Sequence, residues 1–288
     1  MPSFNNPAIQ TRHGLVALTD TGQDGLPIVF LHGSGSSRQV FQRQMTDPRL
    51  AEFRLISIDL PGHGDSEDAI EPADAYTSVG LADAVADVIT ALRIDRYVLC
   101  GWSLGGHVAI EMMGRFDGIA GAVLAGAPPV SKGILGMLRG FHPSFDLFLA
   151  SKQSFSARDI DRFLSLCFAD AALPSFRSAL VRADGRLRAI FSNAMMKGKG
   201  EDQRRVIEQV DVPIAFINGS HDPFIRSSYL STLHVPMLFR QQPQVIESAG
   251  HAPFWETPDA FNALLESFLE DVQRNEIARL KALRHAAG

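Results

Sequence analysis

The sequence predicts an α/β protein with a mostly parallel central sheet flanked by helices. Short apolar runs recur along the chain, each followed by a Gly-rich turn and then by a helical pattern. Such continuous runs are typical of strands that helices cover on both faces. The alternation breaks between residues 131 and 209, where only helical patterns occur. We therefore expect a core formed by residues 1–130 and 210–288, and a helical cap formed by residues 131–209.

The apolar runs predict six buried strands, at residues 27–31, 54–59, 97–100, 119–124, 212–217 and 244–247. Residues 79–92 repeat apolar side chains at the spacing of an amphipathic helix. A second helix is expected over residues 107–116, and Thr257 with Pro258 is a typical start of a third. The charged tail, residues 275–285, is expected to fray.

The cap shows helical patterns at residues 135–149, 157–168 and 176–196, and eight of its phenylalanines lie between residues 141 and 191. A helical insertion of this kind predicts a lid over the carboxyl edge of the sheet, where open α/β sheets bind their ligands. Most of the aromatic side chains are expected to form the core of the lid itself.

The composition restricts the classes of function. The chain is 45% hydrophobic and 20% charged, which is ordinary for a globular enzyme and excludes a disordered chain. Its 27 basic and 32 acidic side chains give a net charge of −5, which does not suit a nucleic-acid-binding surface. No secretory signal or membrane-spanning stretch is recognisable, and two cysteines cannot form a disulfide framework. We expect a cytoplasmic monomer or homodimer that acts on a small molecule, without nucleic acid or membrane partners.

A nucleophile elbow, G-x-S-x-G, is matched by Gly101, Trp102, Ser103, Leu104 and Gly105. The pattern places a serine on a sharp turn, and here a predicted strand precedes the turn and a helical pattern follows it. The flanking glycines let neighbouring backbone approach closely. We therefore predict that Ser103 is a nucleophile; a Gly-rich turn with a capping serine is the alternative.

A catalytic serine needs an adjacent base and an orienting acid. In enzymes with this elbow, the acid and then the histidine follow along the chain. Asp222 and His251 come directly after the last two predicted strands, so we expect both at the sheet edge that carries Ser103. The loop after residues 119–124 offers no acid in their place, and the neighbouring His221 is expected to be structural.

Acyl transfer also needs donors for a developing oxyanion. The candidates are the backbone N–H groups of Ser34, after the first predicted strand, and of Leu104. Phosphate binding by the first loop is disfavoured, because Arg38 stands where G-x-G-x-x-G needs its third Gly and no P-loop occurs. His63 belongs to a turn that we expect to support the site. No spacing typical of a zinc site occurs, so neither a metal nor a cofactor is expected.

These motifs resemble the signature of the serine α/β-hydrolases along the whole chain. H-G-S-G-S-S, D-L-P-G-H-G-D-S, G-W-S-L-G-G and A-G-H-A-P-F occur in the order of that family. The resemblance implies the α/β-hydrolase fold, with the cap inserted after the sixth strand. More narrowly, the chain is similar to the N-acyl-homoserine lactonases of this fold at residues 101–112, 127–130, 183–186 and 217–224.

The chain departs from the lactonase pattern in three places. In that group H-G is followed by Asn, the acid is Glu, and the lid carries a Tyr, whereas this chain has Ser34, Asp222 and, near the Tyr position, Phe163. Asp is a competent orienting acid. Without the Tyr hydroxyl, the lid lacks one candidate hydrogen-bonding group for the ligand.

We expect a cofactor-independent serine hydrolase of a carboxylic ester or lactone, with an N-acyl-homoserine lactone as the favoured substrate. Gly33, Phe41, Trp102 and Phe163 are the candidate substrate contacts, in an apolar slot for the acyl chain. A carboxylesterase, a carbon–carbon bond hydrolase or a perhydrolase would use the same three residues. A small-ligand-binding protein with this fold is the alternative from a different class.

Overall fold

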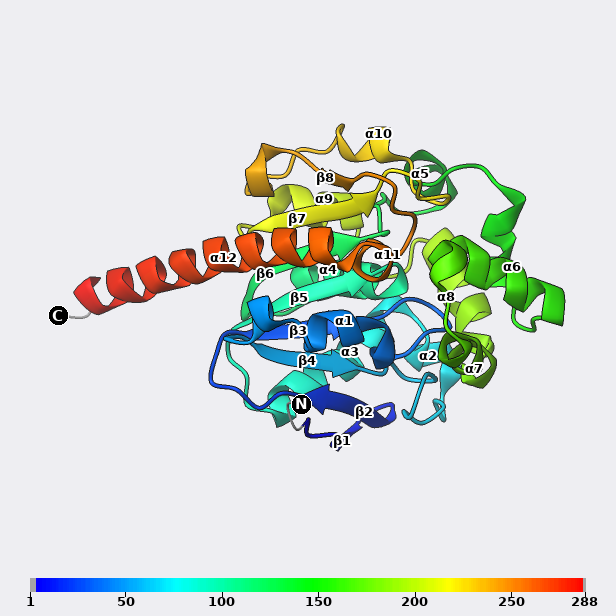
Figure 1. Ribbon diagram of the computed structural model, residues 1–288, viewed down its shortest axis with the longest axis horizontal. Coiled ribbons are helices and arrows are strands. Elements are labelled where there is room, and N and C mark those ends of the chain that lie inside the picture. The colour runs from blue at the N-terminus through cyan, green and yellow to red at the C-terminus, as the bar shows by residue number, and fades with distance from the viewer. Residues whose placement is uncertain (1–3, 287–288) are drawn as a thin grey trace.

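The computed structural model describes residues 4–286, and its centre is a sheet of eight strands (Figure 1). The strands are β1 (Ala8–Thr11), β2 (Gly14–Asp20), β3 (Pro27–Leu31), β4 (Arg54–Ile58), β5 (Tyr97–Trp102), β6 (Ile119–Ala125), β7 (Ile214–Gly219) and β8 (Gln244–Ile246). They lie in the order β1-β2-β4-β3-β5-β6-β7-β8. β2 runs antiparallel to both of its neighbours, and the pairs from β4 to β8 are all parallel. This sheet confirms the predicted fold class.

The central strands are buried throughout, whereas the first two strands are not. Every residue of β5, β6 and β7 is buried, as their continuous apolar runs predicted. The hairpin of β1 and β2 forms one edge of the sheet, and exposed and buried residues mix along both strands. No strand was predicted there, because an edge strand with a solvated face does not need an unbroken apolar run.

Helices cover both faces of the sheet. Outside the cap they are α1 (Gln42–Met45), α2 (Pro72–Ala75), α3 (Ser78–Ala91), α4 (Leu104–Arg115), α10 (Ser227–Leu230), α11 (Pro253–Glu256) and α12 (Pro258–Ala286), with 3-10 turns at Arg38–Phe41, Pro48–Leu50 and Phe239–Gln241. α12 packs on β6 and β7 in front of the sheet, and α4 packs behind it (Figure 1). The tail expected to fray, residues 275–285, instead continues α12 as a helix past the sheet. Within residues 4–286, no helix combines the length and apolar character needed to cross a membrane.

The chain between β6 and β7 is helical, and most of it lies at the carboxyl ends of the strands (Figure 1). Its helices are α5 (Ile134–Gly140), α6 (Ala157–Phe168), α7 (Pro174–Arg182), α8 (Arg186–Met196) and α9 (Gln203–Gln209), with 3-10 turns at Phe145–Ser151 and Ala169–Ala171. The single helix expected over residues 135–149 is wrong, since α5 ends at Gly140 and Pro143 follows it. The pattern over residues 176–196 is likewise divided between α7 and α8.

A buried tyrosine fastens the cap to the core. The Tyr76 hydroxyl accepts a hydrogen bond from the N–H of Ala69 (2.9 Å) and donates one to Asp184 Oδ2 (2.7 Å). Asp184 lies between α7 and α8 and also donates its N–H to Gly62 O (2.8 Å). Burial, followed by the bond to Asp184, raises the pKa of Tyr76, so the hydroxyl retains its proton for that bond. These contacts fix the start of α8 against the loop after β4.

Candidate active site

Ser103 lies at the turn between β5 and α4, with φ 53° and ψ −117°. A serine rarely adopts a positive φ, so this turn is strained, as a nucleophile elbow is expected to be. The turn also depends on close packing at Gly105, where a β-carbon would lie 2.0 Å from Leu31 O on β3. Ser103 is only partly buried, although all of its neighbours in the turn are buried. The elbow therefore holds a serine at the carboxyl edge of the sheet, where a ligand can reach it.

Asp222 lies in the loop after β7, and the backbone of that loop fixes its carboxylate. Oδ1 accepts hydrogen bonds from the N–H groups of Phe224 (2.8 Å) and Ile225 (3.2 Å). Oδ2 accepts the bond from His251 Nδ1 (2.8 Å). The Asp222 side chain is 1% exposed. Each carboxylate oxygen thus accepts a hydrogen bond from a fixed partner, which favours one rotamer of the Asp222 side chain.

His251 lies in the loop after β8, and Trp102 and Gly126 define its position. Trp102, directly before the candidate nucleophile, donates its indole N–H to His251 O (2.8 Å). Gly126 packs against the imidazole, since a β-carbon there would lie 2.6 Å from Cε1. The φ of Gly126 is +62°, which also favours glycine. Trp102 therefore holds the backbone of His251 and Gly126 packs against its ring, while Nδ1 bonds to Asp222.

The end of β6 brings the serine and the histidine together. Ser103 donates its N–H to Ala125 O (2.8 Å), and the next residue, Gly126, touches the imidazole of His251. Within the described chain, neither Ser103 Oγ nor His251 Nε2 has a hydrogen-bond partner. Catalytic hydrogen bonds often tighten only when the substrate is bound. The two groups are thus free to bond to each other or to a substrate.

The two N–H groups expected to bind an oxyanion belong to Leu104, which follows Ser103, and to Ser34, which follows a neighbour of Ser103, Gly33. Leu104 is the first residue of α4, and Ser34 follows Gly33 in the loop after β3. Gly33 adjoins Ser103, since a β-carbon there would lie 3.2 Å from Ser103 Cβ. Neither Ser34 N–H nor Leu104 N–H donates a hydrogen bond to another described residue. Two unpaired backbone donors beside a serine are what stabilisation of an oxyanion requires.

Two buried histidines support the loop after β3, which contains Ser34. His63 accepts a hydrogen bond from Gly35 N–H at Nε2 (3.0 Å), and Nδ1 donates to Pro61 O (3.1 Å). His32 accepts one from Leu60 N–H at Nε2 (3.0 Å). Burial is the main cause that lowers the pKa of both imidazoles, so both remain neutral. The supporting role expected for His63 has this physical basis, and no such role was expected for His32.

The four candidate substrate contacts lie in different surroundings. Gly33 and Trp102 adjoin the site directly, as described above. Phe163 is a cap residue that packs on Phe155, with ring centroids 5.4 Å apart. Phe41 is buried in the core and stacks on Phe254, with ring centroids 4.8 Å apart. Contact of these side chains with a substrate stays a prediction.

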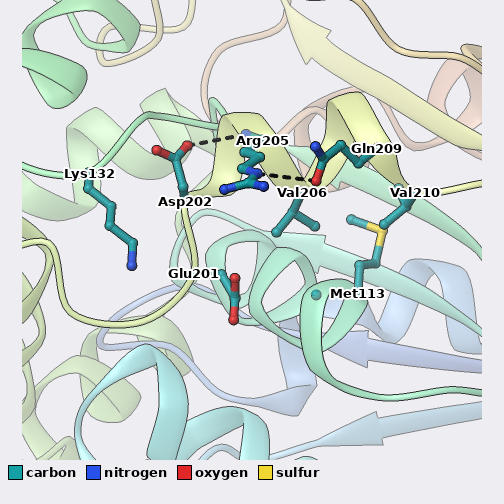
Figure 2. A pocket seen from close by; sticks show the side chains of 9 residues that line it. Met113, Lys132, Glu201, Asp202, Arg205, Val206, Gln209 and Val210 are labelled. Atoms are coloured by element: carbon teal, nitrogen blue, oxygen red, sulfur yellow. Dashed lines mark hydrogen bonds between the residues drawn. The ribbon is translucent and has the colours of Figure 1, made fainter.

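Two pockets lie outside this cluster of residues. The larger, of about 510 Å³, opens between α4 and α9, and Figure 2 shows the charged side chains of Lys132, Glu201 and Arg205 around it. The smaller, of about 320 Å³, is lined by His221 and Gly250 and so adjoins the loops after β7 and β8. Among the described residues, no group of three or more His, Cys, Asp and Glu side chains could hold a metal ion.

Known proteins share both the sequence pattern and this architecture. The sequence model of the alpha/beta hydrolase family matches residues 28–264. The AB hydrolase superfamily protein YisY of Bacillus subtilis (strain 168) is 28% identical over 276 residues, which cover 89% of this chain and 96% of that protein. The pimeloyl-(acyl-carrier protein) methyl ester esterase of Neisseria meningitidis serogroup C is 29% identical over 259 residues, which cover 85% of this chain and 94% of that protein.

Among the solved structures, this chain is similar to an N-acyl homoserine lactonase. A mutant of the N-acyl homoserine lactonase AidH, complexed with N-hexanoyl homoserine lactone, is 35% identical and superposes with a TM-score of 0.91. The match covers 94% of this chain and 99% of that one, which confirms the expected similarity to the lactonases. The family match runs from β3 into α12 and includes the helices between β6 and β7. The chain therefore belongs to the alpha/beta hydrolase family and is a hydrolytic enzyme of that family.

Proposed function

We propose that the protein is a serine hydrolase that opens N-acyl-homoserine lactones through an acyl-enzyme. Ser103 Oγ attacks the lactone carbonyl while His251 Nε2 takes the hydroxyl proton. Asp222 holds the imidazole in the required tautomer and stabilises its charged form. The N–H groups of Ser34 and Leu104 stabilise the negative charge on the carbonyl oxygen.

The second half of the reaction reverses these roles. As the ring C–O bond breaks, His251 returns the proton to the departing alkoxide, which stays tethered to the acyl group. Water then attacks the acyl-enzyme, with His251 as its base, and Ser103 leaves with a proton. The product is the open N-acyl-homoserine, and neither a metal nor a cofactor takes part.

The observation that carries the chemistry is the bond from His251 to Asp222 beside a strained serine. The Asp222 carboxylate accepts three hydrogen bonds in all, so it cannot turn away from the imidazole without leaving buried N–H groups unpaired. The choice of a lactone over a simple ester is supported by the 35% identity to lactonase AidH. The departures at Ser34 and Phe163 concern how the ligand is held rather than how the carbonyl is attacked.

The test compares N-acyl-homoserine lactones of several chain lengths with p-nitrophenyl esters, each with and without a chelator. We expect lactone opening that survives the chelator and is lost in Ser103→Ala. Ester turnover without lactone opening would overturn the lactonase assignment while leaving the serine hydrolase assignment intact. Loss of activity with the chelator would contradict a metal-free mechanism.

A simple carboxylesterase is the second candidate, and one observation favours it. The methyl ester esterase of Neisseria meningitidis is 29% identical over 259 residues. The same assay separates the two candidates, because a carboxylesterase prefers the open-chain ester at equal acyl length. A kcat/KM at least tenfold higher for the lactone than for the matched ester supports the lactonase.

A further inference from the structure

A buried arginine of the cap has an unused donor. Arg188, on α8, is 4% exposed. Its Nε donates to Lys152 O (2.8 Å), and its Nη2 donates to Gln153 O (3.0 Å). Its guanidinium lies over the Phe155 ring, 4.1 Å from the centroid. The remaining nitrogen, Nη1, is shut off from solvent and has no hydrogen-bond partner among the described residues.

Nη1 lies against the loop that carries the oxyanion donors. A β-carbon at Gly35 would lie 3.7 Å from Arg188 Nη1. The preceding residue, Ser34, has a second unused polar atom, since its Oγ is buried and without a partner among the described residues. Gly33, one residue further back, is the neighbour of Ser103 described above. Together with Ser36 Oγ, which is also buried and unpaired among the described residues, three unpaired polar atoms therefore flank the same short stretch of loop, next to the elbow.

Among the residues that the structure describes, no acidic side chain forms an ion pair with this guanidinium. Asp184 is the acidic residue whose charge acts on Arg188, but its carboxylate already bonds to Arg186 and Tyr76. His63, whose Nε2 accepts the N–H of Gly35 in this loop, is held neutral because burial lowers the pKa of its imidazole. A buried cation that has no counter-charge and one unpaired donor lowers the stability of the folded protein, unless a ligand binds to that donor.

We propose that Arg188 Nη1 and Ser34 Oγ form a subsite for an acceptor oxygen of the substrate, close to the carbonyl that Ser103 attacks. The inference rests on the proposed function and narrows its substrate class to esters and lactones that carry a second acceptor oxygen. An amide carbonyl, as in an N-acyl lactone, and a carboxylate both supply that oxygen. The guanidinium binds either one through a charge-assisted hydrogen bond.

Two substrate pairs test this subsite and distinguish the two sources of the oxygen. N-hexanoyl-homoserine lactone is compared with γ-caprolactone, which lacks the amide. p-Nitrophenyl hydrogen succinate is compared with p-nitrophenyl butyrate, which lacks the carboxylate. For each pair, the ratio of kcat/KM with and without the second oxygen is measured in wild type and in Arg188→Met, Arg188→Lys and Ser34→Ala. Arg158→Met is the matched control, because Arg158 is exposed on α6 of the same cap.

We expect Arg188→Met to lower this ratio about 10- to 100-fold for one pair or both, the range for a hydrogen bond to a charged group. Ser34→Ala should lower the same ratio by a smaller factor, and Arg188→Lys should restore part of it. Arg158→Met should match wild type. Thermal unfolding identifies a variant that fails to fold; if Arg188→Met does so, Arg188→Lys and Ser34→Ala carry the test.

Unchanged ratios in the folded variants would overturn the subsite, and so would equal losses on both members of each pair, which indicate a merely structural role. Neither outcome touches the proposed function, because the wild-type enzyme would still turn over these substrates. Wild-type protein that hydrolyses none of the four compounds would overturn the proposed function, and the subsite with it.

Discussion

Replacing Asp222 by Asn should lock His251 in an inactive tautomer. An amide has one acceptor oxygen, whereas the carboxylate uses two. The N–H groups of Phe224 and Ile225 both point at the Oδ1 position, so the amide oxygen should take that place. The amide NH₂ then faces His251 Nδ1, which must accept a hydrogen bond instead of donating one. The imidazole proton therefore moves to Nε2.

A histidine that is protonated on Nε2 cannot accept the proton of Ser103. For the same change in a serine–histidine–aspartate triad, the general expectation is a loss of about 10⁴-fold in kcat. A loss of about 10³- to 10⁴-fold corresponds to about 4–5.5 kcal/mol of transition-state stabilisation. We expect a fall of this size in kcat/KM for p-nitrophenyl butyrate at pH 8.

Asp222→Ala is the control that distinguishes a loss of His251 orientation from a loss of stability of the folded protein. It should lose activity as the Asn variant does, and it should also lower the unfolding temperature, because two buried N–H groups lose their acceptor. The Asn variant should unfold close to wild type. An Asn variant within tenfold of wild-type activity would refute the argument that Asp222 orients His251.

Three further predictions concern packing and ionisation. Gly126→Ala places a methyl group against the imidazole of His251 in a backbone conformation that disfavours alanine, so kcat/KM should fall at least 100-fold; an unchanged value would contradict the packing argument. Tyr76→Phe removes the bond to Asp184 and should lower the free energy of unfolding in urea by about 1–3 kcal/mol, whereas no loss would mean that the cap is not fastened there. Burial lowers the pKa of His107 to about 4, so the unfolded state binds the extra proton between pH 6.5 and pH 4. This histidine should therefore contribute a fall in stability of up to about 3 kcal/mol as the pH drops through that window, beside the contributions of the buried His32 and His63. His107→Gln should flatten this part of the pH profile, and a profile as steep as that of wild type would contradict the assignment.

Elements defined by local sequence were predictable, and those defined by distant contacts were not. The strands β5, β6 and β7 are buried on both faces, so their apolar runs identified them. The edge hairpin of β1 and β2 has no such run. The break in the first cap helix has a local signal in Pro143, because proline does not continue a helix, although the apolar spacing of residues 135–149 runs past it.

In the candidate site, too, the residues marked by local sequence were predictable and their distant partners were not. Ser103, Asp222 and His251 each follow a predictable strand, so their order along the chain was enough to place all three at the carboxyl edge of the sheet, where His251 bonds to Asp222. The residues that hold them in place act across long separations. Trp102 bonds to the carbonyl of His251, 149 residues away, and Asn218 Oδ1 accepts the N–H of Gly126, 92 residues away. No local pattern identifies such partners, because each depends on how the loops meet at the sheet edge.

The activation of Ser103 is tested most directly by covalent labelling with a fluorophosphonate probe, followed by peptide mass mapping. We predict one adduct for each chain, located on Ser103, absent in Ser103→Ala and much slower to form in His251→Ala. An unlabelled wild-type protein would contradict the enzyme account and favour a ligand-binding protein of the same fold. An adduct on another residue would contradict the assignment of the nucleophile.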